Sequence, residues 1–185
     1  MSNSIEIPFS TTLLVRDHCM CLHVQRAARA LARLFDDALR PAGLTNGQFS
    51  LMMSLNRPEP PPMGPVAALL AMDQTTLTAA LKPLQRNGWV NVMENPRDRR
   101  GRLLSLTAEG KGVLAKALPI WESTHAMIDG KLGDSNSARL RQDLQALSWM
   151  TAETPKSPSS TSRPRRSGRQ RQNSAPARPK DRGSR

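Results

Sequence analysis

The chain has few aromatic side chains and almost no cysteine. Its 185 residues include three Phe, three Trp, no Tyr and two Cys. Two cysteines cannot form the disulfide framework of a small secreted domain, which favours a reducing cytoplasm. The hydrophobic share of 38% is ordinary for a globular chain, so one core is expected at this length.

Several other features are missing from the sequence. No stretch is apolar enough to span a membrane, and the N-terminus lacks the basic and apolar regions of a secretory signal. There is no internal repeat, no phosphate-binding glycine loop and no Gly-x-Ser-x-Gly motif. The three histidines and the scattered carboxylates show no nucleophile–base spacing. The sequence therefore predicts neither a membrane protein nor an enzyme, and it indicates no cofactor and no metal site.

What the chain does have is positive charge, and the charge is unevenly placed. The net charge of +12 favours a polyanionic partner. Residues 1–150 hold 17 Lys/Arg against 13 Asp/Glu, whereas residues 151–185 hold 10 against 2. The segment 151–185 has no Val, Ile, Leu, Met, Phe or Trp, so we expect a disordered basic tail rich in Ser, Pro and Arg. Its arginines suit phosphate contacts without sequence preference, although a solubilising extension explains them equally well.

The most informative stretch covers residues 72–107. Asp73 is a good N-cap for a helix, and Leu77, Leu81 and Leu84 recur at helical spacing as a buried stripe. The dipole of such a helix favours phosphate at its N-terminus. Polar side chains on the outer face of its first turns suit base edges and phosphates in a major groove. The predicted recognition residues are Gln74, Thr75, Thr76, Thr78 and Lys82.

A basic hairpin is predicted to follow this helix. Asn87-Gly88 supplies a left-handed stop, and residues 89–94 have the pattern of a strand. Residues 95–102 are expected to form the turn because they contain Asn-Pro and Gly, and residues 103–106 form the returning strand. An arginine at a hairpin tip fits a narrow, strongly negative minor groove. The predicted wing residues are Asp98, Arg99, Arg100 and Arg102.

Asp98 is surrounded by arginines, and we interpret it as the brace that orients Arg100 rather than as a DNA contact. Each half of this pattern also has an ordinary explanation. A charged hairpin is often only solvated, and threonines are often plain helix surface. The two features in this order favour a winged helix-turn-helix that contacts DNA.

The same residues resemble the MarR family of bacterial transcriptional regulators. The resemblance is carried by residues 73–78, 81–88, 98–100 and 106–110, and it extends roughly from Cys19 to Trp149. It implies a mainly α fold with a small β wing, that is, a winged helix-turn-helix domain with N- and C-terminal dimerisation helices. It also implies double-stranded DNA as partner, a homodimer, and a small aromatic or phenolic effector held between the dimer helices and the reading head.

Two positions depart from the family's pattern. The family usually has glycine where Ala71 stands, at the turn into the predicted recognition helix. Many relatives carry arginine just after the position of Thr78, where this chain has Ala79-Ala80. One expected guanine or phosphate reader is therefore absent, and these residues do not predict the operator sequence.

The rest of the chain fits this organisation. Residues 1–15 are expected to form a flexible N-terminal arm, and residues 16–150 one MarR-like winged helix domain. In that domain, residues 16–40 and 108–150 are predicted as dimerisation helices and residues 45–107 as the DNA-binding unit. Single apolar stripes on three helices need a partner surface, and a two-fold dimer satisfies them together.

One motif in the first predicted helix has a second interpretation. His18-Cys19-Met20-Cys21-Leu22-His23 places four soft-metal ligands within six residues. One helix cannot gather all four around one ion, and a Cys-x-Cys disulfide is sterically poor in a helix. Buried thiols at a helix interface explain the motif. The alternative is a redox or metal sensor that uses Cys19, Cys21 and His23.

The sequence therefore predicts a sequence-specific DNA-binding transcriptional regulator, a dimeric repressor released by a small-molecule effector. We expect it in the cytoplasm, and on the nucleoid when it is bound to DNA. A thiol- or metal-responsive regulator that uses Cys19 and Cys21 is one alternative. A non-specific nucleoid or RNA-binding protein driven by the basic tail is another.

Overall fold

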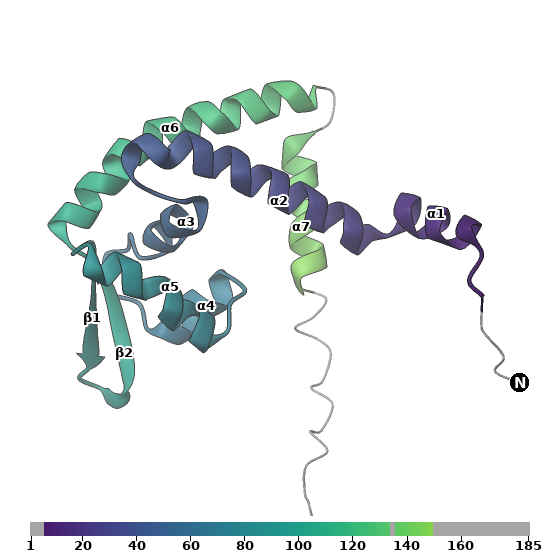
Figure 1. Cartoon of the computed structure of the whole chain (residues 1–185). Helices are drawn as coiled ribbons and strands as arrows, with labels where there is room; N and C mark the ends of the chain where they lie inside the picture. Colours follow the sequence, from purple (N-terminus) through teal and green to yellow (C-terminus); the bar gives the residue numbers. More distant parts are fainter. Residues whose placement is uncertain (1–5, 134–135, 150–185) are drawn as a thin grey trace, which may run out of the picture. The chain divides into compact units, whose positions relative to one another are not determined.

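The structure is a computed structural model that describes residues 6–133 and 136–149, without the side chains of Arg99, Arg100 and Trp149 (Figure 1). The tail predicted over residues 151–185 lies outside the described residues. The described elements, in chain order, are α1 (Phe9–His18), α2 (Met20–Leu39), the 3-10 turn η1 (Arg40–Ala42), α3 (Asn46–Ser54), α4 (Met63–Leu69), α5 (Gln74–Arg86), β1 (Val90–Asn95), β2 (Asp98–Leu106), α6 (Ala108–Leu132) and α7 (Ser137–Trp149). The predicted mainly α fold with a small β wing is confirmed.

The chain divides into two compact units, residues 1–137 and 138–185, and α7 falls almost entirely in the second. In α7 the leucines at positions 140, 144 and 147 are exposed, and an ion pair joins Arg139 Nε to Asp143 Oδ1 at 2.9 Å. None of the described helices is both long enough and apolar enough to cross a membrane.

The core of the first unit is aliphatic and joins the helices to the hairpin. α5 contributes Leu77, Leu81 and Leu84, which are at most 2% exposed, so the predicted buried stripe is confirmed. β2 contributes Leu104, which is fully buried against the same cluster. Elements α2, α3, α4 and α6 complete the core, with Phe35, Leu39, Phe49, Leu51, Met52, Val66, Ala67, Leu114 and Ala117.

Three helices begin at side-chain caps, and the cap at Asp73 is the one predicted above. Thr45 and Gln48 form the capping box of α3. Asp73 caps α5 through the backbone N–H of Thr76, and Thr107 caps α6 through the backbone N–H of Gly110. Each cap joins a side chain to the backbone N–H three residues further on, and such a local pair can be recognised in the sequence alone.

The N-terminal helix differs from the prediction of one helix over residues 16–40. The chain is already helical from Phe9, inside the segment predicted as a flexible arm. The helix is then interrupted at Cys19, which takes an extended conformation with φ −72° and ψ 106°. α2 begins at Met20 and ends at Leu39. Pro41 lies in the 3-10 turn η1 that follows it. The break at Cys19 involves this one residue, and neither glycine nor proline marks it in the sequence.

The wing is an antiparallel hairpin of β1 and β2, which projects from the helices in Figure 1. The predicted turn over residues 95–102 is wrong in its bounds, because strand β2 already starts at Asp98. Asn95 pairs with Asp98 and Glu94 with Arg102, so residues 99–101 are extra residues on the β2 side. The other edge of β2 is also paired, since Leu104 N donates to Pro61 O at 3.0 Å. Pro61 belongs to a proline-rich segment, residues 57–64, which lies some forty residues before β2 in the sequence. No local pattern predicts this pairing.

Ala71 lies in the tight turn between α4 and α5 with a φ of 51°, the left-handed region. This conformation costs an alanine about 1–2 kcal/mol, whereas glycine adopts it freely at a smaller entropic cost. Ala71→Gly should therefore raise the free energy of unfolding by about 0.5–1 kcal/mol, measured by urea titration. Ala68→Gly, within α4, is the matched control and should lower that free energy. Equal destabilisation by both substitutions would contradict the strained geometry of the turn.

Candidate nucleic-acid interface

The N-terminus of α5 is occupied by its own cap. Asp73 Oδ1 accepts from the backbone N–H of Thr76 at 2.7 Å, and Asp73 Oδ2 accepts from the hydroxyl of Thr76 at 2.8 Å. These bonds, the backbone bond first, lower the pKa of the Asp73 carboxyl and keep it ionised. A carboxylate at this end disfavours a phosphate there. The predicted attraction of phosphate to this N-terminus therefore competes with the cap and stays a prediction, while the side of α5 is open to a ligand.

The side of α5 carries an open hollow of about 370 Å³, lined by Gln74, Thr75, Thr78, Ala79 and Lys82. Four of the five predicted recognition residues thus lie together on one exposed face. The hydroxyl of Thr78 donates to Gln74 O at 2.7 Å, so it can only accept from a ligand. Among the described residues, the Gln74 amide and the Thr75 hydroxyl have no hydrogen-bond partner. They are the side chains of this face that can still both donate and accept.

Thr76, the fifth predicted recognition residue, lies outside this hollow because its side chain belongs to the cap. Its hydroxyl proton is already donated to Asp73. Substitution of Thr76 would therefore change the start of α5 as well as any contact with DNA. The hydrogen bonds of the cap thus separate Thr76 from the other four residues.

The wing presents basic residues on a tight turn. Pro96 and Arg97 form the tip, where Asn95 Oδ1 accepts from Arg97 N at 3.0 Å and the Arg97 side chain is exposed. Arg102 lies further along β2, with its Nη2 3.6 Å from Glu94 Oε1 on the paired strand. The brace predicted between Asp98 and Arg100 lies outside the described side chains, as does the side chain of Arg99. Arg97 was not among the predicted wing residues, although Asn95-Pro96 marks a turn at that place.

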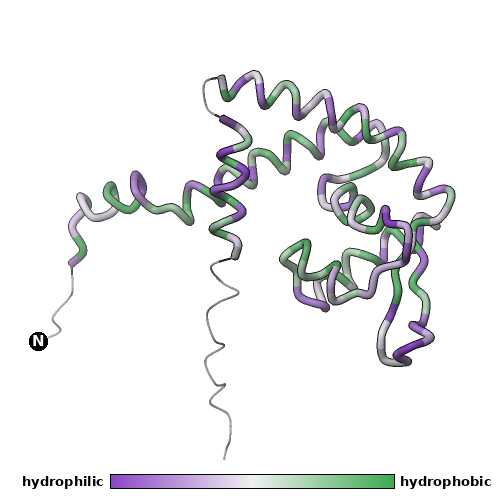
Figure 2. The backbone as a smooth tube through the Cα atoms, turned by 180° about the vertical axis from the view of Figure 1, so that it is seen from behind, coloured by the Kyte–Doolittle hydropathy of each residue, from purple (hydrophilic) through white to green (hydrophobic). Residues whose placement is uncertain are grey.

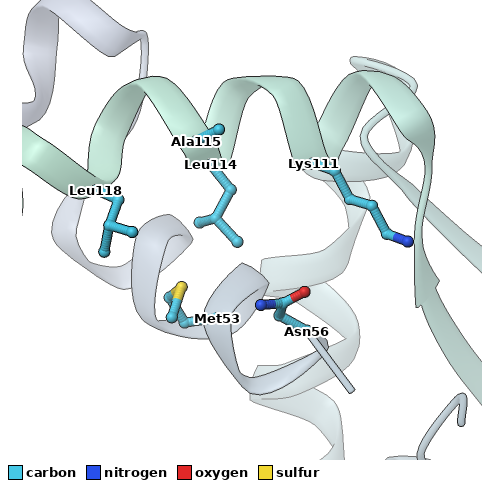
Figure 3. A pocket seen from close by; sticks show the side chains of 6 residues that line it. All are labelled: Met53, Asn56, Lys111, Leu114, Ala115 and Leu118. Carbon is cyan, nitrogen blue, oxygen red and sulfur yellow. The ribbon is translucent and has the colours of Figure 1, made fainter. Parts of the chain in front are cut away.

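A second candidate site is an apolar groove between α3 and α6. Its first part, about 240 Å³, is lined by Met53, Asn56, Lys111, Leu114, Ala115 and Leu118 (Figure 3). Its second part, about 230 Å³, shares Met53 and Leu118 and adds Phe49, Ser50 and Trp121. Leu114 and Leu118 point from α6 toward Met53, while Asn56 and Lys111 give one end a polar character. The groove therefore fits an apolar molecule with one polar or anionic end.

The cysteine motif does not form a metal site in the described residues, where no group of three possible ligands is found. Cys19 is half-buried and Cys21 is exposed. His23 Nδ1 lies 3.0 Å from Cys19 O, so this ring nitrogen is engaged with the backbone. The two cysteines differ in backbone conformation, because Cys19 is extended and Cys21 lies in the first turn of α2.

An exposed polar helix backed by buried leucines and followed by a basic hairpin defines a winged helix-turn-helix. Comparisons with known proteins agree with this class. The MarR family model matches residues 44–101. The DNA complex of the Mycobacterium tuberculosis regulator MosR is 37% identical with a TM-score of 0.67, and the match covers 73% of this chain and 97% of that one. The chain therefore belongs to the MarR family of transcriptional regulators.

Two further relatives have lower identity or coverage. The uncharacterised regulator YwoH of Bacillus subtilis is 30% identical over 88 residues, which is 48% of this chain and 64% of YwoH. The chain thus spans less than two thirds of this curated relative. CouR of Rhodococcus jostii, solved with p-coumaroyl-CoA, is 22% identical with a TM-score of 0.63 over 72% of this chain and 94% of CouR. At that identity CouR shows the shared fold.

Proposed function

We propose that this protein is a homodimeric, sequence-specific DNA-binding repressor that a small molecule releases from its operator. The observation that carries the proposal is the exposed face of α5, where Gln74, Thr75 and Lys82 lie together above fully packed leucines. A rigid helix with free donors on one side is what base readout in the major groove requires. The M. tuberculosis regulator MosR, the relative with 37% identity, was solved with DNA, which supports DNA as the partner.

The dimer is supported by apolar side chains that α1 and α2 leave uncovered. Hydrophobic residues recur along both helices in Figure 2. Phe9 on α1 is 72% exposed, and Leu31 and Leu34 on α2 are 42% and 36% exposed, although the same face of α2 buries Phe35. Apolar surface of this extent usually marks a contact with another protein. A two-fold pair of chains covers it and presents two copies of α5 to successive major grooves.

The effector site that we propose is the groove between α3 and α6. The groove lies directly beside the core that α6 shares with α3, so a bound molecule would separate or tilt these helices. A ligand shifts affinity for DNA only as far as it prefers one arrangement of the two reading heads. CouR has an aromatic acyl thioester as its ligand, which supports an aromatic effector here. We place the protein in the cytoplasm, and on the nucleoid when it is bound to DNA.

The proposal is tested against a non-specific binder by deleting residues 151–185. The tail holds 10 Lys/Arg against 2 Asp/Glu, so its removal should weaken binding to all DNA and flatten the salt dependence. A regulator keeps its preference for a selected genomic fragment over a scrambled duplex after this deletion. Loss of all binding in the shortened chain, measured by fluorescence anisotropy at stated salt, would favour the tail-driven alternative.

Two contacts on α5 should have separable effects. Gln74→Ala should change the preferred base sequence, since one good base contact discriminates by about 1–3 kcal/mol. Lys82→Ala should weaken binding evenly across sequences and reduce the salt slope by about one. Lys116→Ala, which removes an exposed lysine from α6, is the control. The assignment of α5 fails if Gln74→Ala selects the same fragments with the same ranking as the unmodified protein.

The thiol-responsive regulator remains a second candidate because of the backbone at Cys19. The extended conformation there gives the Cys19 side chain another direction relative to Cys21 than a continuous helix would give it. In such a response hydrogen peroxide oxidises the two thiols to a disulfide and is reduced to water. The double substitution Cys19→Ser with Cys21→Ser should then keep DNA binding and lose release by peroxide. Equal release of the double variant and the unmodified protein in a gel-shift titration would exclude this candidate.

A further inference from the structure

The end of α5 is tied to the start of α6 through one threonine. Thr107 Oγ1 donates to Gly88 O at 2.7 Å and accepts from Gly110 N at 2.9 Å, and Thr107 N donates to Trp89 O at 3.0 Å. Gly88 and Trp89 are in turn bonded to the last turn of α5, since Gly88 N donates to Gln85 O and Trp89 N to Leu84 O. These bonds form a continuous path from the candidate recognition helix to α6.

The contact has little freedom to move. Gly88 holds a φ of 73°, and a Cβ placed there would lie 3.2 Å from Glu109 Oε2 on α6. At Gly110 a Cβ would lie 2.1 Å from Trp89 O, so the backbone at the base of the wing touches the first turn of α6 directly. Trp89 is also the residue before β1, which means that α5, the wing and α6 meet at this one place.

We infer that Thr107 is a positioning residue for DNA recognition, which sets the direction of α5 and of the wing relative to α6. This inference rests on the proposed function. A hydroxyl both donates and accepts, so Thr107 performs two tasks. Its acceptor side caps α6, which is a matter of helix stability. Its donor side holds Gly88 O, and therefore holds the end of the reading helix at a fixed place on α6.

Substitutions at Thr107 separate the two tasks. Thr107→Ser keeps both hydrogen bonds. Thr107→Asp keeps the cap, because aspartate is a preferred N-cap, but an ionised carboxylate cannot donate to Gly88 O. Ala108→Asp is the charge control. Ala108 is exposed, and the aspartate introduced there adds the same negative charge one residue further along the first turn of α6. All variants are made in the full-length chain.

The measurement is the affinity of each variant for a selected genomic fragment and for a scrambled duplex of equal length, at one salt concentration, together with its melting temperature. Thr107→Asp should melt within a few degrees of Ala108→Asp and bind the scrambled duplex equally well. Its preference for the selected fragment should fall about tenfold below that of Ala108→Asp. This is the effect expected from the loss of one hydrogen bond between neutral groups. Thr107→Ser should keep the preference of the unmodified protein.

An unchanged preference in folded Thr107→Asp overturns the inference and leaves the proposed function intact. If the unmodified protein itself holds both duplexes equally, the proposed function and the inference fail together. Should Thr107→Asp not fold, Thr107→Ala decides the question well below its own melting temperature. It lacks both bonds and adds no charge, so its preference must still fall about tenfold, and an unchanged preference overturns the inference.

Discussion

Gly110→Ala should destabilise the protein by about 3 kcal/mol or more and remove DNA binding with the fold. The added methyl group would lie 2.1 Å from the carbonyl oxygen of Trp89 and 2.9 Å from its carbonyl carbon. Both neighbours are backbone atoms, so no side-chain rotation relieves the overlap. The same carbonyl accepts the hydrogen bond from Thr107 N, so moving it also breaks a contact between the wing and α6.

Gly112→Ala is the matched control for this prediction. It lies two residues further along α6, and a Cβ there has no neighbour within 4 Å. Alanine in an open helical position should stabilise the protein by about 1 kcal/mol relative to glycine. Urea unfolding of the two variants compares them directly. Similar unfolding midpoints would contradict the close approach of α6 to Trp89.

Arg100→Ala should weaken binding to a selected operator fragment about 10- to 100-fold and leave the fold and the dimer intact. The backbone of Arg100 lies among the extra residues of β2 between Asp98 and Arg102, next to the turn of the wing. A guanidinium carried by such a hairpin suits the strongly negative potential of a narrow minor groove. The loss is measured by gel-shift titration with the unmodified protein as reference.

Arg29→Ala provides the control for charge alone. Arg29 is exposed on α2, and its Nη2 donates to Gln25 Oε1 at 3.2 Å, well away in sequence from the wing. The two substitutions remove the same charge, so non-specific attraction to DNA falls by a similar amount in both. If Arg100→Ala and Arg29→Ala bind the operator equally well, the wing makes no contact of its own.

The sequence predicted α5 almost completely because its determinants are local. The cap at Asp73, the leucines at positions 77, 81 and 84 and the stop at Gly88 all act within one or two helical turns. The wing was predicted as a hairpin with the wrong turn. Strand β2 starts at Asp98 because Asn95 pairs with Asp98, with residues 99–101 as extra residues before the regular register resumes at Arg102, and such a shift of register leaves no local signal. The break at Cys19 likewise lacks a signal, since neither glycine nor proline stands there.

The sequence predicted four of the residues that line the hollow on α5, but it did not predict their hydrogen bonding. The sequence placed Thr76 and Thr78 beside Gln74 and Thr75 as equivalent polar residues. The structure distinguishes them, because the first two already donate to Asp73 and to the carbonyl of Gln74. The groove between α3 and α6 needs the packing of two helices that are more than fifty residues apart, so its lining residues have no pattern of their own.

The most direct test of the account is the mass of the complex on a fragment selected from genomic DNA, measured by light scattering in an excess of unrelated duplex. The account predicts two chains on one duplex, and a recovered site with two related halves about one helical turn apart. A single chain per duplex, or complete displacement by an equal amount of the unrelated DNA, would contradict it.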